Sequence, residues 1–163
     1  MTALSSIEPN LEFLIGTLAK LDEQLNLRDQ HHQALAKEPS NTKLAEWADV
    51  IDAIGLSYLW VLGAYEAIRT LDQRLRNMGP SAVHRHRATN ALKHQFERLR
   101  VPLAKLEAAN RHRATDYSFL RPGIDDGRGI AWEVSAGVVV SRSQLADQFL
   151  AVLEGIQNGS IKN

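Results

Sequence analysis

Apolar residues recur at helical spacing along most of the chain, and the first series alternates steps of four and three residues. That series is Ile7, Leu11, Leu14, Leu18, Leu21 and Leu25. Such steps place one apolar stripe along a helix. We expect this helix to begin near Ser5, because Ser5 and Glu8 have capping-box spacing and Pro9 falls in the first turn. A stripe of this length needs a partner helix, in the same chain or in a second copy.

A second helix is predicted between a break at residues 37–41 and a stop at 78–80. Pro39 disfavours helical backbone just before it, and Gly79-Pro80 ends the pattern that follows. Apolar residues between these points form two stripes on neighbouring faces, which are Trp47, Ile51, Ile54, Tyr58, Val61, Tyr65 and Ile68, and Leu56, Trp60, Gly63, Ala67 and Leu71. A helix that is apolar around so much of its circumference is typically central. Its most apolar run, 53–64, has twelve residues, fewer than the roughly 20 that cross a bilayer.

A third helix is predicted from about Ser81 to Ala109. Its core stripe is Leu92, Phe96, Leu99, Leu103 and Leu106. Pro102 lies inside this pattern and removes one backbone hydrogen bond, so we expect a kink near residue 98.

The last third of the chain has a different pattern. Residues 110–129 contain Pro122 and three glycines without a sustained period, which predicts a long loop. β-branched runs then flank residues 135–137 and predict a hairpin with strands near 130–134 and 138–141. Ser141 and Gln144 have capping-box spacing and open a final helix, which is followed by a frayed tail at about 157–163. The inward positions of that helix are Leu145, Phe149, Val152, Leu153 and Ile156.

Together these elements predict a mainly α fold in one domain, residues 1–163. It is a helical bundle of three long helices plus a C-terminal helix, with a short β-hairpin near residues 130–141 and the long loop at 110–129. Two strands alone are marginal in water, so the hairpin should pack on the helices or on another copy. The long stripes and the open hairpin edge also favour a homodimer.

Composition is that of a folded protein. The chain has 163 residues, of which 44% are hydrophobic and 23% are charged, which suits one domain with a packed core. The sequence contains no cysteine, and this excludes disulfides, thiolate nucleophiles and zinc–cysteine sites. The first residues lack the cationic start and apolar run of a secretory signal. We therefore expect a cytoplasmic protein without a membrane partner.

Charge is distributed unevenly although the formal net charge is zero. Residues 84–128 hold ten Lys or Arg and five Asp or Glu, a net charge of +5, whereas residues 1–83 carry −4 and residues 129–163 carry −1. A basic segment of this kind can bind a polyanion, or it can meet an acidic face within the fold or a dimer.

The run VHRHRATNALKHQFERLR at 83–100 opens this basic segment. At about 100° per residue, Arg87, His94, Arg98 and Lys105 fall on one line of the helix, opposite its core stripe. Outward cations can follow a phosphate backbone, and a plain solvated face is the alternative. The candidate binding residues are Arg85, Arg87, Arg98, Lys105, Arg111 and Arg113. We predict a non-enzymatic interaction module that binds nucleic acid or an acidic protein, with a structural protein–protein interaction domain as the alternative.

Six residues separate Arg87 from His94. This pair resembles the Arg-x4–6-His signature of the HEPN superfamily, helical proteins of which many are dimeric ribonucleases that unite two such motifs across the dimer. The resemblance covers eight residues and the all-helical outline. It implies that Arg87 stabilises the phosphate and that His94 serves as acid or base. Chance spacing in a segment rich in Arg and His is the alternative.

No metal site and no cofactor are expected. His84 and His86 are two residues apart, and His31 and His32 are adjacent. Neither pair has the i,i+4 spacing that lets two imidazoles on a helix share an ion.

Overall fold

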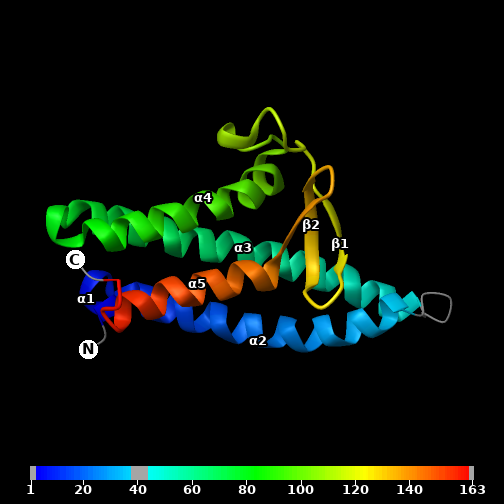
Figure 1. Cartoon of the computed structure of the whole chain (residues 1–163). Helices are drawn as coiled ribbons and strands as arrows, with labels where there is room; N and C mark the ends of the chain where they lie inside the picture. Colours follow the sequence, from blue (N-terminus) through cyan, green and yellow to red (C-terminus); the bar gives the residue numbers. More distant parts are fainter. Residues whose placement is uncertain (1–2, 38–43, 162–163) are drawn as a thin grey trace.

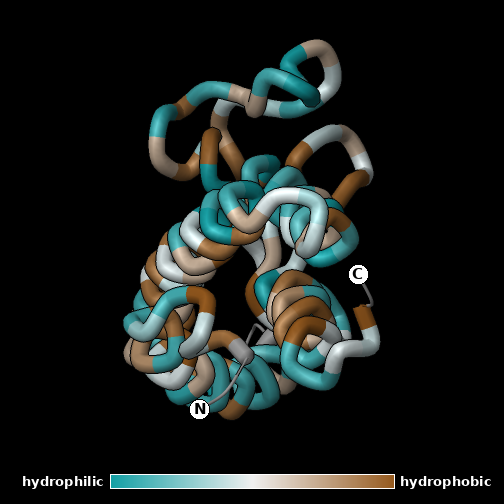
Figure 2. The backbone as a smooth tube through the Cα atoms, turned by 90° about the vertical axis from the view of Figure 1, so that its left-hand side faces the viewer, coloured by the Kyte–Doolittle hydropathy of each residue, from teal (hydrophilic) through white to brown (hydrophobic). Residues whose placement is uncertain are grey.

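The computed structural model describes residues 3–37 and 44–161, and it has five helices and a small antiparallel sheet in that part of the chain (Figure 1). The predicted mainly α fold is confirmed. The helices are α1 (Ala3–Ile7), α2 (Pro9–Lys37), α3 (Leu44–Asn77), α4 (Val83–Lys105) and α5 (Arg142–Gln157), and the strands are β1 (Arg121–Asp125), β2 (Gly129–Ser135) and β3 (Val138–Ser141). Viewed along their axes, the long helices surround a common core (Figure 2).

The first long helix begins at Pro9, so the predicted start near Ser5 is wrong. Residues 3–7 form the separate short helix α1, and Glu8 lies between the two helices. The amide of Glu8 donates to the Leu4 carbonyl (3.0 Å), and its own carbonyl accepts from the amide of Leu11 (3.1 Å). Proline has no amide hydrogen to continue α1 but suits the first position of a new helix. The predicted break at 37–41 falls mostly on residues 38–43, outside the described residues.

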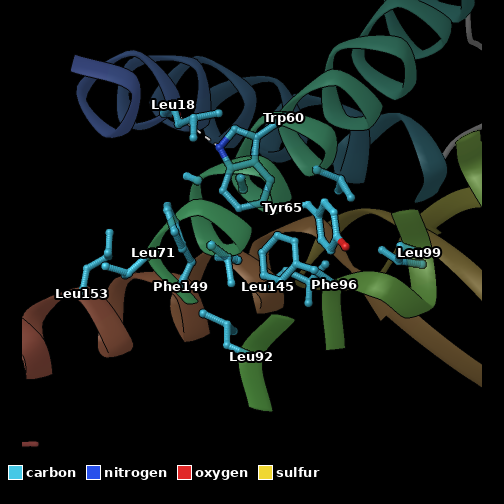
Figure 3. Packing of buried hydrophobic residues seen from close by; sticks show 14 of the residues in the cluster. Leu18, Trp60, Tyr65, Leu71, Leu92, Phe96, Leu99, Leu145, Phe149 and Leu153 are labelled. Carbon is cyan, nitrogen blue, oxygen red and sulfur yellow. Dashed lines mark hydrogen bonds between the residues drawn. The ribbon is translucent and has the colours of Figure 1, made fainter. Parts of the chain in front are cut away.

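Three aromatic rings from three helices form the centre of the core (Figure 3). Trp60 of α3 lies 6.0 Å from the ring of Phe96 in α4 and 6.3 Å from that of Phe149 in α5, between ring centroids. The indole Nε1 of Trp60 donates to the carbonyl of Leu18 in α2 (3.1 Å). Helix α2 lies close to α3 here, because a Cβ at Gly63 would be only 2.9 Å from Leu18 Cδ2. The predicted central position of the second long helix is therefore confirmed.

The first turns of α3 differ from the prediction. Trp47 and Ile51 were expected in the core, yet they are 46% and 67% exposed. Figure 1 shows the reason: this end of α3 extends beyond α4 and α5, so only one side of it is covered. By length and composition alone α3 could also cross a membrane, and 33% of its most apolar window is buried. Core helices pass the same test, and α3 packs against both α2 and α4.

The predicted loop at 110–129 contains structure of its own. Residues Asn110–His112 form a 3-10 turn, and β1 pairs antiparallel with β2, so the predicted hairpin is the second half of a three-stranded sheet ordered β1-β2-β3. The strand at 121–125 was not predicted because it contains Pro122, and proline in a sequence pattern argues against a strand. β1 lies at the edge of the sheet, where proline is tolerated. The sheet packs on the helices through β2, whose Ile130, Trp132 and Val134 are all in the core cluster.

The end of α4 sets the direction of the segment that follows it. Helix α4 ends at Lys105 rather than at Ala109, because Leu106 takes the left-handed conformation (φ 56°) and its amide donates to the Pro102 carbonyl (3.0 Å). Leu106 is 64% exposed, so its predicted place in the core is wrong.

The predicted cap of α5 is confirmed, since the Ser141 hydroxyl accepts from the amide of Gln144 (3.1 Å). After α5 the amide of Ile161 donates to the Gly155 carbonyl (3.1 Å), so residues 158–161 fold back where a frayed tail was expected.

Arg142, the first residue of α5, is fully buried and joins three elements. Its guanidinium donates to Asp22, to Asn26 Oδ1 (2.7 Å) and to Asp29 Oδ2 (2.6 Å), all on α2. Asp29 in turn accepts from the amide of Ile130 in β2 (3.1 Å). Burial raises the pKa of Asp22 despite the opposing effect of the Arg142 charge. This cluster is therefore the polar connection between α2, α5 and the sheet.

Replacing Arg142 with Met should lower the free energy of unfolding by about 3–5 kcal/mol, because it leaves the buried Asp29 carboxylate without its cation. Urea unfolding followed by tryptophan fluorescence measures this loss, since Trp60 is buried in the core. Arg128→Met, at an exposed arginine, is the matched control and should change stability by less than about 0.5 kcal/mol. Equal losses in the two variants would contradict a structural role for the buried guanidinium.

Candidate functional site

An open cleft of about 710 Å³ lies between α4, the turn that follows it and the start of α5. We call it the histidine cleft. It is lined by His94, Gln95 and Arg98 of α4, Arg111 and His112 of the 3-10 turn, Val140 of β3, and Gln144, Leu145 and Gln148 of α5. A second hollow of about 380 Å³ shares His94, Arg111 and His112 and adds Glu97, Lys105 and Glu107. Because the two hollows share three side chains, we treat them as one groove.

The backbone explains how residues distant in sequence meet in this cleft. Helical periodicity places His94 and Arg98 on the side of α4 away from Phe96, which is in the core. The left-handed Leu106 then turns the chain, and the segment 106–120 stands above the end of α4 in both views (Figures 1 and 2). The 3-10 turn in this segment carries Arg111 and His112 back to the side of α4 that bears His94.

His94 is held by a carboxylate on its own helix. Its Nδ1 lies 2.7 Å from Glu97 Oε2, and the Tyr65 hydroxyl donates to Glu97 Oε1 (3.3 Å). Burial raises the pKa of Tyr65, and the Glu97 charge adds to this, so the phenol keeps its proton for that bond. When Glu97 accepts the proton on Nδ1, Nε2 is the ring nitrogen left for a ligand.

Arg98 anchors the segment 106–120 to α4. Its Nε and Nη2 donate to the two carboxylate oxygens of Asp116 at 2.6 and 2.9 Å, a bidentate pair. Burial alone would raise the pKa of Asp116, but the hydrogen bonds from Arg98 outweigh it and hold this pKa below its usual range. His112 Nδ1 lies 3.9 Å from the same carboxylate. The charge of Arg98 is thus compensated within the protein, and Arg98 is a positioning residue as well as part of the lining.

The structure brings together four of the predicted site residues: His94, Arg98, Lys105 and Arg111. The other three lie outside the lining of the groove. Arg85 donates to the Ser81 carbonyl (3.2 Å), and Arg113 is exposed. Arg87 is exposed on the same side of α4 as His94, but seven residues of helix separate the two along the axis by about 10 Å. Within one chain, the Arg87–His94 pair suggested by the HEPN resemblance is therefore not gathered into this cleft.

Lys93, another cation of the run 83–100, binds an acidic side chain that is buried in the core. Lys93 Nζ and Asn90 Nδ2 donate to the buried Asp72 of α3, at 2.7 and 3.2 Å. Burial alone would raise the pKa of Asp72, but these two hydrogen bonds outweigh it and lower this pKa. The basic run thus has two faces, one bound to Asp72 and one facing the histidine cleft.

Formal charges nearly cancel around the cleft. Three cations, Arg98, Lys105 and Arg111, face three carboxylates, Glu97, Glu107 and Asp116. These charged side chains therefore leave the groove close to neutral. Within residues 3–37 and 44–161, no group of three or more His, Cys, Asp or Glu side chains could hold a metal ion.

Sequence reasoning missed His112, Glu97 and the two glutamines of α5 as members of a site. One signal was available for the first: the pentapeptide RHRAT occurs at 85–89 and again at 111–115. The first copy lies within α4 and the second spans the 3-10 turn and the residues after it. The glutamines carried no signal, because only the packing of α5 beside α4 brings them to the cleft.

Comparisons of the chain with protein-family models, with curated proteins and with solved structures find no match. The HEPN resemblance of Arg87 and His94 accordingly stays a prediction.

Asp116→Asn should lower the free energy of unfolding by about 1.5–3 kcal/mol at pH 7, because it removes the charge-assisted bonds from Arg98. The pKa of Asp116 is lowered in the folded state, so its contribution is present above the unfolded pKa of about 4 and is lost as pH falls through the folded value. The difference between wild type and variant should therefore shrink below pH 4 in urea unfolding experiments.

Asp126→Asn is the control for this prediction, since its side chain is 87% exposed and its nearest cation, Lys37 Nζ, is 3.9 Å away. It should cost less than about 1 kcal/mol at any pH. A difference between Asp116→Asn and wild type that stays constant from pH 7 to pH 3 would show that the carboxylate charge does not anchor the segment.

Proposed function

We propose that the protein binds a single strand of nucleic acid in the histidine cleft. The observation that carries this proposal is the meeting of His94 and Arg98 of α4 with Arg111 and His112 of the 3-10 turn in one open groove. Guanidinium groups bind phosphate oxygens, and imidazole rings and guanidinium planes stack on unpaired bases. The amides of Gln144 and Gln148, on the opposite wall, offer both donors and acceptors to base edges.

The shape of the surface favours a single strand over a duplex. A helix that reads duplex DNA protrudes into the major groove. The outer side of α4 is instead partly covered by the segment 106–120, which is fixed there through Arg98 and Asp116. A concave groove with cations along it suits the backbone of one strand.

Cations beyond the cleft extend this surface. Arg87 on α4 and Arg113 after the 3-10 turn are both exposed, and neither has an ion pair within the described part of the chain. In the proposed complex they contact phosphates on either side of the cleft. The absence of cysteine is consistent with a cytoplasmic location, which we include in the proposal.

A second candidate function, contact with a protein, rests on a different observation. Trp47, Ile51 and Leu59 of α3 are 46%, 67% and 56% exposed at steps of four and eight residues. Neighbouring apolar side chains of this size at a helix surface often mark a protein contact. The predicted homodimer would find a contact face here, on α3, whereas the stripe of α2 is buried within the chain through Leu11, Leu18 and Leu25.

The full-length protein should bind a labelled 12-nucleotide RNA more weakly as salt rises. With about three phosphates neutralised, affinity should fall about 18-fold between 50 and 200 mM salt, because bound counterions are released from the strand. Fluorescence anisotropy measures this effect.

Arg111→Gln should weaken this binding about five-fold or more at 50 mM salt, because it removes an exposed cation from the groove. Arg128→Gln removes an equal charge from the turn between β1 and β2, outside the groove lining, and should change affinity less than two-fold. Equal losses in the two variants would show attraction to net charge alone. Binding that is absent at 50 mM salt would overturn the proposed function.

A further inference from the structure

We infer that the histidine cleft cleaves RNA by transesterification, with His94 and His112 as the acid–base pair. This inference rests on the proposed function and goes beyond it, because it assigns a reaction and names RNA as the substrate class. The two histidines come from different elements, α4 and the 3-10 turn, and both line the two hollows of the groove. Their side chains are 24% and 35% exposed, so a bound strand can reach each ring.

Each ring has a carboxylate near its Nδ1, at hydrogen-bond distance for His94 and farther away for His112. Glu97 Oε2 lies 2.7 Å from Nδ1 of His94, and Asp116 Oδ2 lies 3.9 Å from Nδ1 of His112. A carboxylate at Nδ1 orients an imidazole and leaves Nε2 to exchange a proton with a substrate. The carboxylates are themselves held, Glu97 by the Tyr65 hydroxyl and Asp116 by Arg98. His94 thus has a hydrogen-bonded partner that orients its ring, and His112 lies beside the Asp116 carboxylate without a hydrogen bond to it.

The backbone around His112 is also fixed. Its carbonyl accepts from the amides of Thr115 (3.0 Å) and Asp116 (2.8 Å), which closes a tight turn over the residues after it. The Thr115 hydroxyl donates to Asp116 Oδ1 (3.1 Å) in the same turn. A catalytic imidazole needs this kind of support, because small displacements of a proton-transfer group cost much of its effect.

The reaction uses only groups that the cleft and the RNA contain. One imidazole, in its neutral form, takes the proton of a ribose 2′-hydroxyl, and the 2′-oxygen forms a bond to the adjacent phosphorus. The bond from phosphorus to the 5′-oxygen of the next nucleotide breaks, and the other histidine, as imidazolium, gives that oxygen a proton. The products are a 2′,3′-cyclic phosphate and a 5′-hydroxyl, and exchange with water restores both rings. Arg111 stabilises the charge that develops on the non-bridging oxygens.

Two properties separate this reaction from binding alone. The attacking group is the 2′-hydroxyl, so DNA of the same sequence and 2′-O-methyl RNA must bind without being cut. One histidine must be neutral while the other is protonated, so the rate must pass through a maximum as pH is varied.

The test uses the full-length protein with 5′-labelled RNA, the matched DNA and the 2′-O-methyl RNA, in the presence of EDTA to suppress metal-dependent nucleases. Cleavage of the RNA alone, with a 2′,3′-cyclic phosphate end identified by mass spectrometry, is the expected result. His94→Gln and His112→Gln should each keep RNA affinity within about three-fold and lose at least 100-fold in rate. Arg128→Gln, purified in parallel, should cut at the wild-type rate.

Glu97→Gln gives an independent readout, because Glu97 acts through His94. The variant should keep its RNA affinity, but one of the two apparent pKa values of its pH–rate profile should shift. A purely structural role of Glu97 would not cause this shift. Circular dichroism and thermal unfolding of every variant identify any that fail to fold, in which case His94→Asn or His112→Asn replaces it.

The outcomes distinguish the two proposals. RNA that binds with the expected salt dependence and stays intact overturns the inferred reaction and leaves the proposed function standing. RNA that does not bind overturns both. Cleavage that persists unchanged in His94→Gln and His112→Gln comes from a contaminant and also overturns the inference.

Discussion

The buried guanidinium of Arg142 is the constraint on which the arrangement of the other elements depends. A fully buried arginine is tolerated only when carboxylates and acceptors surround it, and here α2 supplies all three partners. The same Asp29 that pairs with Arg142 also accepts from the amide of Ile130 in β2. Gly129 must be a glycine here, since it has φ 73° and a Cβ would overlap Asp29. One polar cluster therefore fixes the sheet and α5 against α2.

This constraint extends to the cleft because Arg142 is the first residue of α5. Fixing it against α2 sets the direction in which α5 leaves the sheet, and Gln144 and Gln148 lie on its first turns. The opposite wall consists of α4 and the 3-10 turn, and the bidentate pair of Arg98 and Asp116 fixes the segment that contains this turn to α4. Two ion pairs, one buried in the core and one at the surface, thus determine the distance between the walls of the groove.

Helical periodicity made most of the fold predictable from the sequence. The stripes through Leu18, Trp60 and Phe96 lie in the core where their spacing placed them. What could not be predicted depended on tertiary contacts. The strand at 121–125 contains a proline and becomes a strand only by pairing with β2. Helical spacing predicted the α4 residues of the cleft, and charge alone pointed to Arg111, but the turn at Leu106 that returns Arg111 to them leaves no periodic signal.

The near balance of charge around the cleft shows that the net charge of the segment 84–128 is larger than the charge of the groove itself. Two of the ten cations of this segment have close carboxylate partners within the protein: Lys93 binds Asp72, and Arg98 binds Asp116. A surface built for tight, permanent neutralisation of a polyanion would leave those cations free. The charged side chains of the groove instead come close to cancelling, and two imidazoles line it. Such a surface suits a ligand that is held briefly while protons move, and suits a permanent scaffold for nucleic acid less well.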